Sequence, residues 1–166
     1  MGMDVYGRKP KNETGEYFRA NVWSWRPIYW LCYTAISRHE EETGYDDLIP
    51  DKTFRGMEYN DGYGLRSDRK CNLLSDYLQD VVDIFFDPSG IPFEHKPSGD
   101  FKFGVNKDGE FYIDTGFYTD KEGKFLSEEK CKDPNIEGKH SPYRTNKEHI
   151  KGFIDFLRNC GGFQVW

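Results

Sequence analysis

The sequence predicts a single α+β domain, residues 1–166, with a mostly antiparallel sheet and about three helices. Three observations lead to this class. A chain of 166 residues is long enough for one sizeable core, and no break in it calls for a second domain. Apolar residues recur at helical spacing in three segments, with short extended segments and turns between them. The order of these segments lacks the regular strand–helix–strand alternation of a parallel sheet.

The amino-terminal part is expected to contain two extended segments and a helix. Residues 3–6 predict a short strand, and residues 17–23 predict an extended segment because apolar residues alternate there with Tyr, Arg and Asn. A helix is then expected from about Pro27, which suits a first helical turn, to about His39. Its buried face would carry the residues at helical spacing: Ile28, Leu31, Cys32, Ala35 and Ile36.

The middle of the chain predicts a second helix and a hairpin. Ser67 can cap a helix whose apolar stripe runs from Leu73 to Phe85. Residues 101–105 and 110–114 flank the turn Asn106-Lys107-Asp108-Gly109, which is typical of a β-hairpin. A similar turn followed by a strand recurs at residues 120–126, which suggests a small meander.

The carboxyl-terminal part predicts one more helix and one more strand. Thr145-Asn146-Lys147-Glu148 matches a capping box, with the buried stripe Ile150, Phe153, Ile154 and Leu157 after it. Gly161 and Gly162 end this helix, and residues 163–166 are expected to form a terminal strand. Connections at about residues 40–58, 87–100 and 127–144 are expected to be irregular.

Charge and cysteine usage narrow the class of protein. The net charge of -6 argues against a general nucleic-acid binder and, more weakly, against binding to anionic membranes. The four cysteines are far apart, with no secretory signal before them, so reduced thiols and a cytoplasmic location are expected. The longest nearly apolar run, residues 28–36, is too short to span a bilayer.

Known catalytic and metal-binding patterns are not found. Cys131, His140, His149 and Cys160 are separated by eight, eight and ten residues, whereas structural zinc sites use close ligand pairs. No signature places a cysteine beside a base, and the Gly-rich segments match neither a phosphate loop nor a dinucleotide fingerprint. The sequence therefore predicts no metal and no cofactor, and favours a binding protein over an enzyme.

The segment from Tyr17 to Trp30 is the most distinctive, because it holds three of the four tryptophans. If residues 19–25 are extended, one face carries Arg19, Asn21, Trp23 and Trp25, with Arg26 next to it. Such a face could clamp a nucleobase or a partner's peptide, with the arginines on phosphate or carboxylate. The alternative is that Trp23 and Trp25 fill the core and Arg26 stacks across a ring.

A turn-rich segment, residues 59–64, supplies two further candidate binding residues. Asn60 and Asp61 precede Gly62, and their oxygens suit a cation or a ribose hydroxyl, although the acidic ligands of a calcium loop are lacking. A plain turn is the simpler interpretation. Asp61 is expected to line the same cleft as the aromatic segment, together with Asp4 and Tyr6.

Motifs at both ends resemble a family of small uncharacterised proteins found in bacteria and their phages. They are Met-Gly-Met-Asp-Val-Tyr-Gly, Gly-Glu-Tyr-Phe-Arg-Ala-Asn-Val-Trp-Ser-Trp-Arg-Pro, Asn-Asp-Gly-Tyr-Gly-Leu and Phe-Ile-Asp-Phe-Leu-Arg-Asn-Cys-Gly-Gly-Phe-Gln-Val-Trp. Some members carry a Cys-rich, zinc-knuckle-like insert where this chain has residues 101–126, so no metal role carries over. The resemblance implies a phage or mobile-element association.

These observations lead to one functional hypothesis and two alternatives. The first is a binding protein that acts by stoichiometric recognition, as a counter-defence inhibitor of a host protein. The second is a pocket, with or without catalysis, for a nucleotide-like molecule, built on the segment 17–30. The third is that the aromatic cluster is only core and that function lies in surface loops such as residues 88–99.

Overall fold

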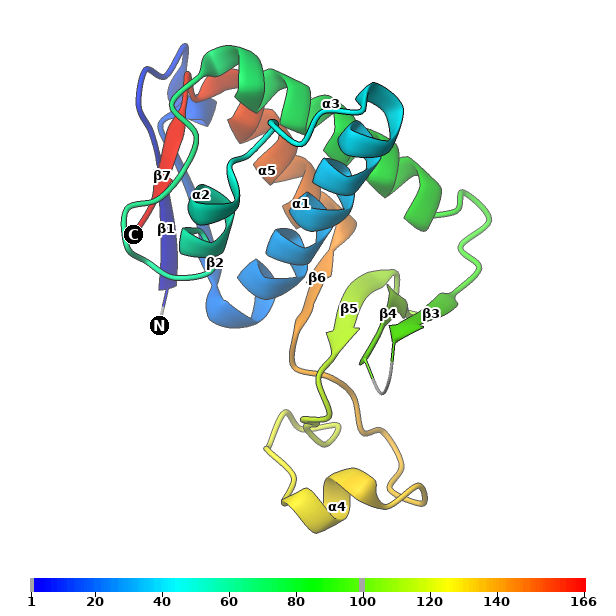
Figure 1. The fold of residues 1–166 in the computed structure, drawn as a ribbon. Coiled ribbons are helices and arrows are strands. Elements are labelled where there is room, and N and C mark those ends of the chain that lie inside the picture. The colour runs from blue at the N-terminus through cyan, green and yellow to red at the C-terminus, as the bar shows by residue number, and fades with distance from the viewer. Residues whose placement is uncertain (1, 99–100) are drawn as a thin grey trace.

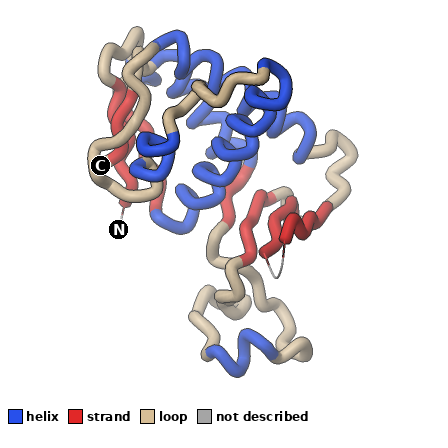
Figure 2. The backbone as a smooth tube through the Cα atoms, viewed as in Figure 1, coloured by secondary structure: helices blue, strands red, loops and turns tan. Residues whose placement is uncertain are grey.

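The computed structural model describes residues 2–98 and 101–166, which form five α-helices and seven strands in two antiparallel sheets (Figure 1). The predicted α+β class is therefore confirmed. Three helices are long and two are short, and the two sheets lie on either side of the long helices (Figure 2).

The first sheet joins both ends of the chain. Its central strand β1 (Gly2–Gly7) pairs with β2 (Tyr17–Asn21) on one side and with β7 (Phe163–Val165) on the other. Met3, Val5, Phe18 and Ala20 alternate along β1 and β2 and are buried against the helices. The predicted strands at residues 3–6 and 163–166 are confirmed.

The three long helices are α1 (Val22–Thr43), α3 (Asp68–Phe85) and α5 (Lys147–Asn159). Helix α3 packs against both α1 and α5. Their predicted apolar stripes are the buried faces, which confirms the helical periodicity. The core is strongly aromatic, and its largest fully buried side chains are Trp25, Phe111, Phe153, Phe156 and Phe163.

The second sheet has the strand order β3 (Phe93–Ser98), β4 (Phe101–Val105), β5 (Glu110–Asp114) and β6 (Arg144–Asn146). The predicted hairpin is β4 and β5. Its inner face is apolar, and Phe111 stacks on Phe85 of α3 with their ring centroids 5.8 Å apart. Because side chains alternate along a strand, the intervening residues face away from the helices.

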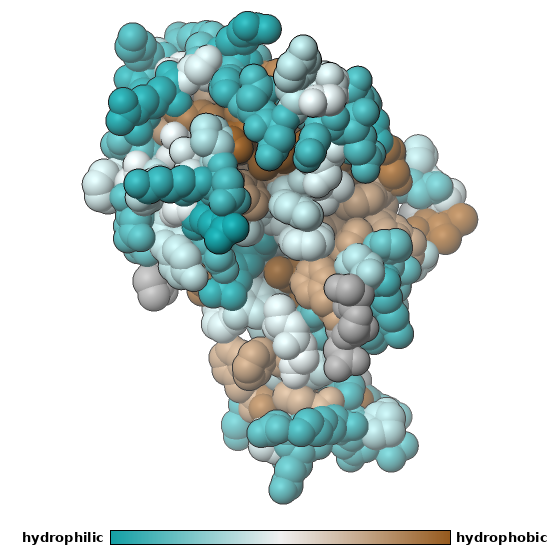
Figure 3. All heavy atoms as spheres, in the orientation of Figure 1, coloured by the Kyte–Doolittle hydropathy of each residue, from teal (hydrophilic) through white to brown (hydrophobic). Residues whose placement is uncertain are grey.

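Residues 115–143 leave the second sheet after β5 and return to it at β6. They form a projection, named here the 115–143 excursion, which carries the short helix α4 (Glu128–Lys132) away from the long helices (Figure 1). In Figure 3 its far end is largely hydrophilic, and hydrophobic atoms gather where it meets the rest of the molecule.

The recurring turn motif has the same hydrogen bonds in both copies. The Asn106 side chain accepts from the amides of residues 108 and 110, and the Asp120 side chain accepts from those of residues 122 and 124. Gly109 and Gly123 adopt positive φ at the equivalent position. The strand expected after the second turn is replaced by a single bridge between Thr119 and Phe125.

Several boundaries differ from the prediction. Helix α1 begins at Val22, so Pro27 lies inside it and not in its first turn. The regions expected to be irregular contain α2 (Asp51–Gly56), β3 and α4, and positions 99 and 100 lie outside the described residues. Short elements of this kind carry too few residues for a clear periodic pattern.

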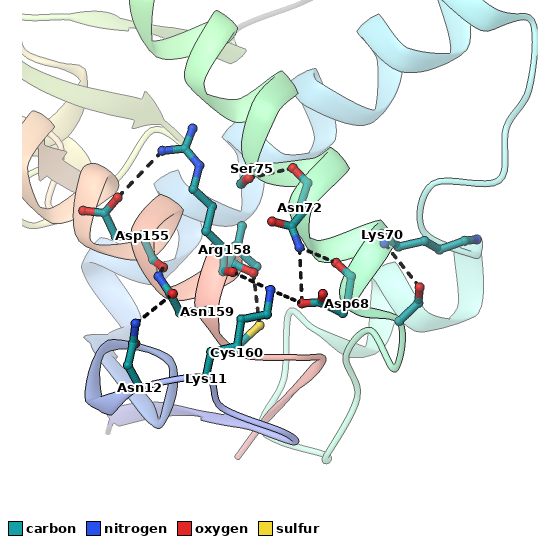
Figure 4. A network of polar contacts seen from close by, with 12 residues as sticks. Lys11, Asn12, Asp68, Lys70, Asn72, Ser75, Asp155, Arg158, Asn159 and Cys160 are labelled. Carbon is teal, nitrogen blue, oxygen red and sulfur yellow. Dashed lines mark hydrogen bonds and ion pairs between the residues drawn. The ribbon is translucent and has the colours of Figure 1, made fainter.

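The first turn of α3 and the last turn of α5 are tied to the loop after β1 (Figure 4). Lys11 Nζ lies 2.9 Å from Asp68 Oδ1 and donates to the Arg158 carbonyl oxygen at 3.1 Å. Asn12 Nδ2 donates to Asn159 Oδ1 at 2.9 Å. These contacts connect the loop after β1 to both α3 and α5.

Candidate functional site

The predicted binding face of residues 19–25 is not extended throughout, and that expectation is wrong from Val22 onward. Asn21 ends β2 and caps α1, because its side chain accepts a hydrogen bond from the Ser24 amide at 2.9 Å. Two residues apart in a strand share a face, whereas two residues apart in a helix are rotated by about 200°. Trp23 and Trp25 therefore point in opposite directions.

Trp25 belongs to the core. Its ring is fully buried, packs edge-on against Phe153 and donates from Nε1 to the Met57 carbonyl oxygen at 2.8 Å. A buried indole N–H needs such a partner. The alternative of a core tryptophan is thus correct for Trp25, which has no exposed surface for a ligand.

The hollow that Trp23 lines includes none of Arg19, Asn60 and Asp61. The Arg19 side chain is exposed on β2, with Nε 3.9 Å from Asp4 Oδ1. Asn60 and Asp61 are exposed in a turn that the Gly62 amide fixes to the Val165 carbonyl oxygen at 2.7 Å. Asp61 lines a shallow hollow with Arg8, Lys52 and Arg66, whereas Trp23 lines a different one.

Trp23 and Arg26 meet aromatic residues of the 115–143 excursion. The ring centroid of Trp23 lies 5.4 Å from that of Phe125 and 5.1 Å from that of Tyr143. The Arg26 guanidinium carbon lies 5.3 Å from the centroid of Tyr143, on its face. We name these four side chains the Trp23 surface. Trp23 remains 37% exposed and Phe125 55% exposed.

A hollow of about 380 Å³ adjoins this surface. Asn21 and Asn146, the caps of α1 and α5, lie on it, and Arg144 and Glu110 form an ion pair at 3.7 Å between Nε and Oε2. Burial lowers the pKa of His149, which therefore favours the neutral imidazole. The full lining is Asn21, Trp23, Ser24, Glu110, Pro142, Arg144, Thr145, Asn146 and His149.

The sequence reasoning missed Phe125 and Tyr143. Tyr143 lies in a segment expected to be an irregular connection, and Phe125 lies in the strand expected after the second turn; each is more than a hundred residues from Trp23. A large aromatic residue among polar neighbours was the available signal, because such a residue must either reach a core or stay exposed.

The remaining sequence predictions concern metals, thiols and membranes. All four cysteines are free and buried. Within residues 2–98 and 101–166, no three His, Cys, Asp or Glu side chains are grouped so as to hold a metal ion. None of the helices in that part of the chain combines the length and apolar character that crossing a bilayer requires.

The chain matches no protein-family model, no curated protein and no solved structure. The resemblance of its end motifs to a phage-associated family therefore stays a prediction.

Proposed function

We propose that the protein acts by stoichiometric recognition of a partner protein and that the Trp23 surface makes the central contact. The observation that carries this proposal is the exposed contact between Trp23 and Phe125, whose ring centroids lie 5.4 Å apart. Two segments of the chain bring large aromatic side chains together and leave both open to water. Tryptophan, tyrosine and arginine are the residues that most often dominate binding energy at protein interfaces.

The surroundings of the Trp23 surface suit an interface. The neighbouring hollow offers the side chains of Asn21, Arg144 and Asn146 at its edge, which gives a polar rim beside an aromatic centre. Arg26 is partly buried, and its Nε has no hydrogen-bond partner among the described residues. Because that Nε atom is itself buried, a partner's carboxylate would pair with the terminal nitrogens of the Arg26 guanidinium group.

The proposed partner is a host protein, with the chain acting as its inhibitor. This part of the proposal rests on the resemblance of the end motifs to a phage-associated family and on the net charge of -6, which favours a partner with a basic surface. Such an inhibitor would act by occupying its partner and would need to catalyse no reaction.

The experiment compares partner capture by the wild-type chain and by variants of the Trp23 surface. Trp23→Ala and Phe125→Ala should each weaken one-to-one binding of the captured and purified host protein by about tenfold or more, measured by isothermal titration calorimetry. Tyr45→Ala is the matched control, because Tyr45 is an exposed aromatic residue in the loop after α1. Equal binding by all three variants, or no saturable partner, would contradict the proposal.

A second candidate function is supported by the hollow beside Trp23. A nucleotide-like molecule could stack its base on Trp23 and place a phosphate near Arg144, since the hollow of about 380 Å³ has room for part of such a ligand. Titration with a nucleotide panel should then quench tryptophan fluorescence in the wild type but not in Trp23→Phe. Unchanged fluorescence across the panel would remove this alternative.

A further inference from the structure

The outer face of the second sheet carries a cavity that is separate from the Trp23 surface. Its volume is about 430 Å³, and strands β3, β4 and β5 line it on one side. The 115–143 excursion lines it on the other side, through Tyr118 and residues 139–141. The volume lies within the range of small-molecule sites in proteins.

Two tyrosine–carboxylate pairs shape this cavity. Tyr112 donates its hydroxyl hydrogen to Glu94 Oε2 at 2.8 Å, and Tyr118 donates to Asp114 Oδ2 at 2.7 Å. Burial first, and then the neighbouring carboxylate, raises the pKa of both phenols, so that both stay protonated. Each phenol oxygen and each carboxylate keeps lone pairs that can accept further hydrogen bonds.

The sheet register explains how the first pair forms. Glu94 on β3 and Tyr112 on β5 lie on either side of Gly104 on β4, so the tyrosine reaches across a residue without a side chain. A Cβ at Gly104 would come within 2.0 Å of the Phe93 carbonyl oxygen. The glycine is thus required for the close approach of β3 that forms this wall.

Lys139 and Ser141, two of the hydrogen-bond donors around the cavity, are already engaged within the protein. Lys139 Nζ donates to the carbonyl oxygens of Cys131 and Asp133 at 2.8 and 2.9 Å, and lies 5.0 Å from the ring centroid of Tyr118. The Ser141 hydroxyl donates to the Ile113 carbonyl oxygen at 2.6 Å. Both donors are therefore largely satisfied without a ligand.

We propose that this cavity binds a small organic cation, an amine or amidine with an apolar body. The cationic head would donate to Asp114 and to the phenol oxygens, while the apolar part would lie against the rings of Tyr112 and Tyr118, which line the same cavity. The lining carries two carboxylates, Glu94 and Asp114, against one ammonium, Lys139, whose Nζ is already held by two carbonyl oxygens, so the balance of charge disfavours an anionic ligand. The chemistry is the same for a free small molecule and for an arginine side chain of a peptide, and the test separates these sources.

The test measures binding of phenethylamine and benzamidine to the full chain by saturation-transfer NMR and calorimetry, with phenethyl alcohol and benzoate as neutral and anionic counterparts. Both cations should bind saturably and the counterparts should not. Asp114→Asn should weaken cation binding about tenfold, because a hydrogen bond to a charged group is lost. Tyr118→Phe, which keeps the ring beside Lys139, should weaken it severalfold.

The matched control is Tyr77→Phe, which removes the hydroxyl group of a tyrosine–glutamate pair outside this cavity and should leave cation binding unchanged. Acetyl-arginine methylamide represents an arginine side chain within a peptide. If it binds more tightly than benzamidine, the site is assigned to an arginine of a partner. Equal binding of benzoate, or no cation binding below about 10 mM, would overturn the proposal. Trp23→Ala should not alter cation binding, which keeps this test distinct from that of partner recognition.

Discussion

The indole nitrogen of Trp25 donates to the Met57 carbonyl oxygen at 2.8 Å and so links α1 to the end of α2 across 32 positions of sequence. Both residues are fully buried. This one hydrogen bond explains why a tryptophan stands two residues from the exposed Trp23 and yet has a structural role. It also allows a direct test of how the two rings differ.

We expect Trp25→Phe to lower the free energy of unfolding by about 2–4 kcal/mol, because it leaves a cavity and an unpaired buried carbonyl. Urea denaturation followed by circular dichroism measures this difference. Trp23→Phe is the control and should change stability by less than about 1 kcal/mol, since Trp23 is partly exposed. Similar losses in both variants would show that the assignment of Trp25 to the core is wrong.

The long helices were predictable from the sequence because their buried stripes repeat at the helical period over many residues. Ile28 to Ile36 in α1 and Ile150 to Leu157 in α5 are examples, and all of their predicted stripe residues are buried. The α+β class followed from the same patterns. The hairpin at residues 101–114 was predictable because its turn residues favour one local geometry.

The start of α1 was not predictable in this way. Residues 17–23 alternate as a strand does, but the Asn21 side chain caps a helix at the position where alternation predicts continued extension. A pattern of seven residues fits both interpretations, and the tertiary contacts of Trp25 decide between them. For that reason, Arg19 and Asn21 of the predicted face lie in β2, whereas Trp23 and Trp25 lie in α1.

The Trp23 surface and the cavity on the second sheet depend on contacts between distant segments. Asn21, Trp23 and Arg26 were predicted as binding residues, but their neighbours Phe125 and Tyr143 are brought to them only by the return of the chain to β6. The pairing of Tyr112 with Glu94 likewise requires the register of three strands. Local patterns do not contain this information.

Asn146, and not Thr145, caps α5, so the predicted capping box is displaced by one residue. The Asn146 side chain accepts from the His149 amide at 2.8 Å, whereas Thr145 still belongs to β6 and pairs with Phe111. Asn146→Ala should therefore reduce stability by about 1 kcal/mol in urea denaturation.

Thr145→Val is the companion variant for that cap. The Thr145 hydroxyl is buried and has no partner in the described part of the chain, so an apolar replacement of the same shape should leave stability unchanged within about 0.5 kcal/mol or raise it. A larger loss from Thr145→Val than from Asn146→Ala would restore the capping box predicted from the sequence.

Gly15 allows the loop after β1 to lie directly on the end of α5. A Cβ at this position would come within 2.0 Å of the Asn159 carbonyl oxygen, which is backbone and cannot easily move. Gly15→Ala should lower the midpoint of thermal unfolding and reduce stability by more than about 2 kcal/mol.

The control for that substitution is Gly152→Ala. Gly152 is exposed inside α5, and its Cβ would make only an ordinary contact, 3.7 Å from Phe18 Cε2. Alanine there should raise stability by about 0.5–1 kcal/mol, because glycine is unfavourable within a helix. If both substitutions change stability in the same direction, the close approach of the backbone at Gly15 does not exclude a side chain there.

His149 should make stability depend on pH. Its ring packs on Phe18 with the centroids 4.9 Å apart, and burial lowers its pKa in the folded state below the ordinary value. The unfolded chain therefore takes up the proton first as the pH falls. The contribution of neutral His149 to stability is fully present above its unfolded pKa of about 6.5, and it is lost as the pH falls through the folded pKa.

Replacement of His149 by glutamine removes this titration and keeps a polar side chain beside Arg144 and Glu110 in the same hollow. Urea denaturation between about pH 7 and about pH 5 should thus show a smaller loss of stability for His149→Gln than for the wild type. Parallel curves for the two proteins would mean that the imidazole of His149 is charged as easily in the folded state as in the unfolded state.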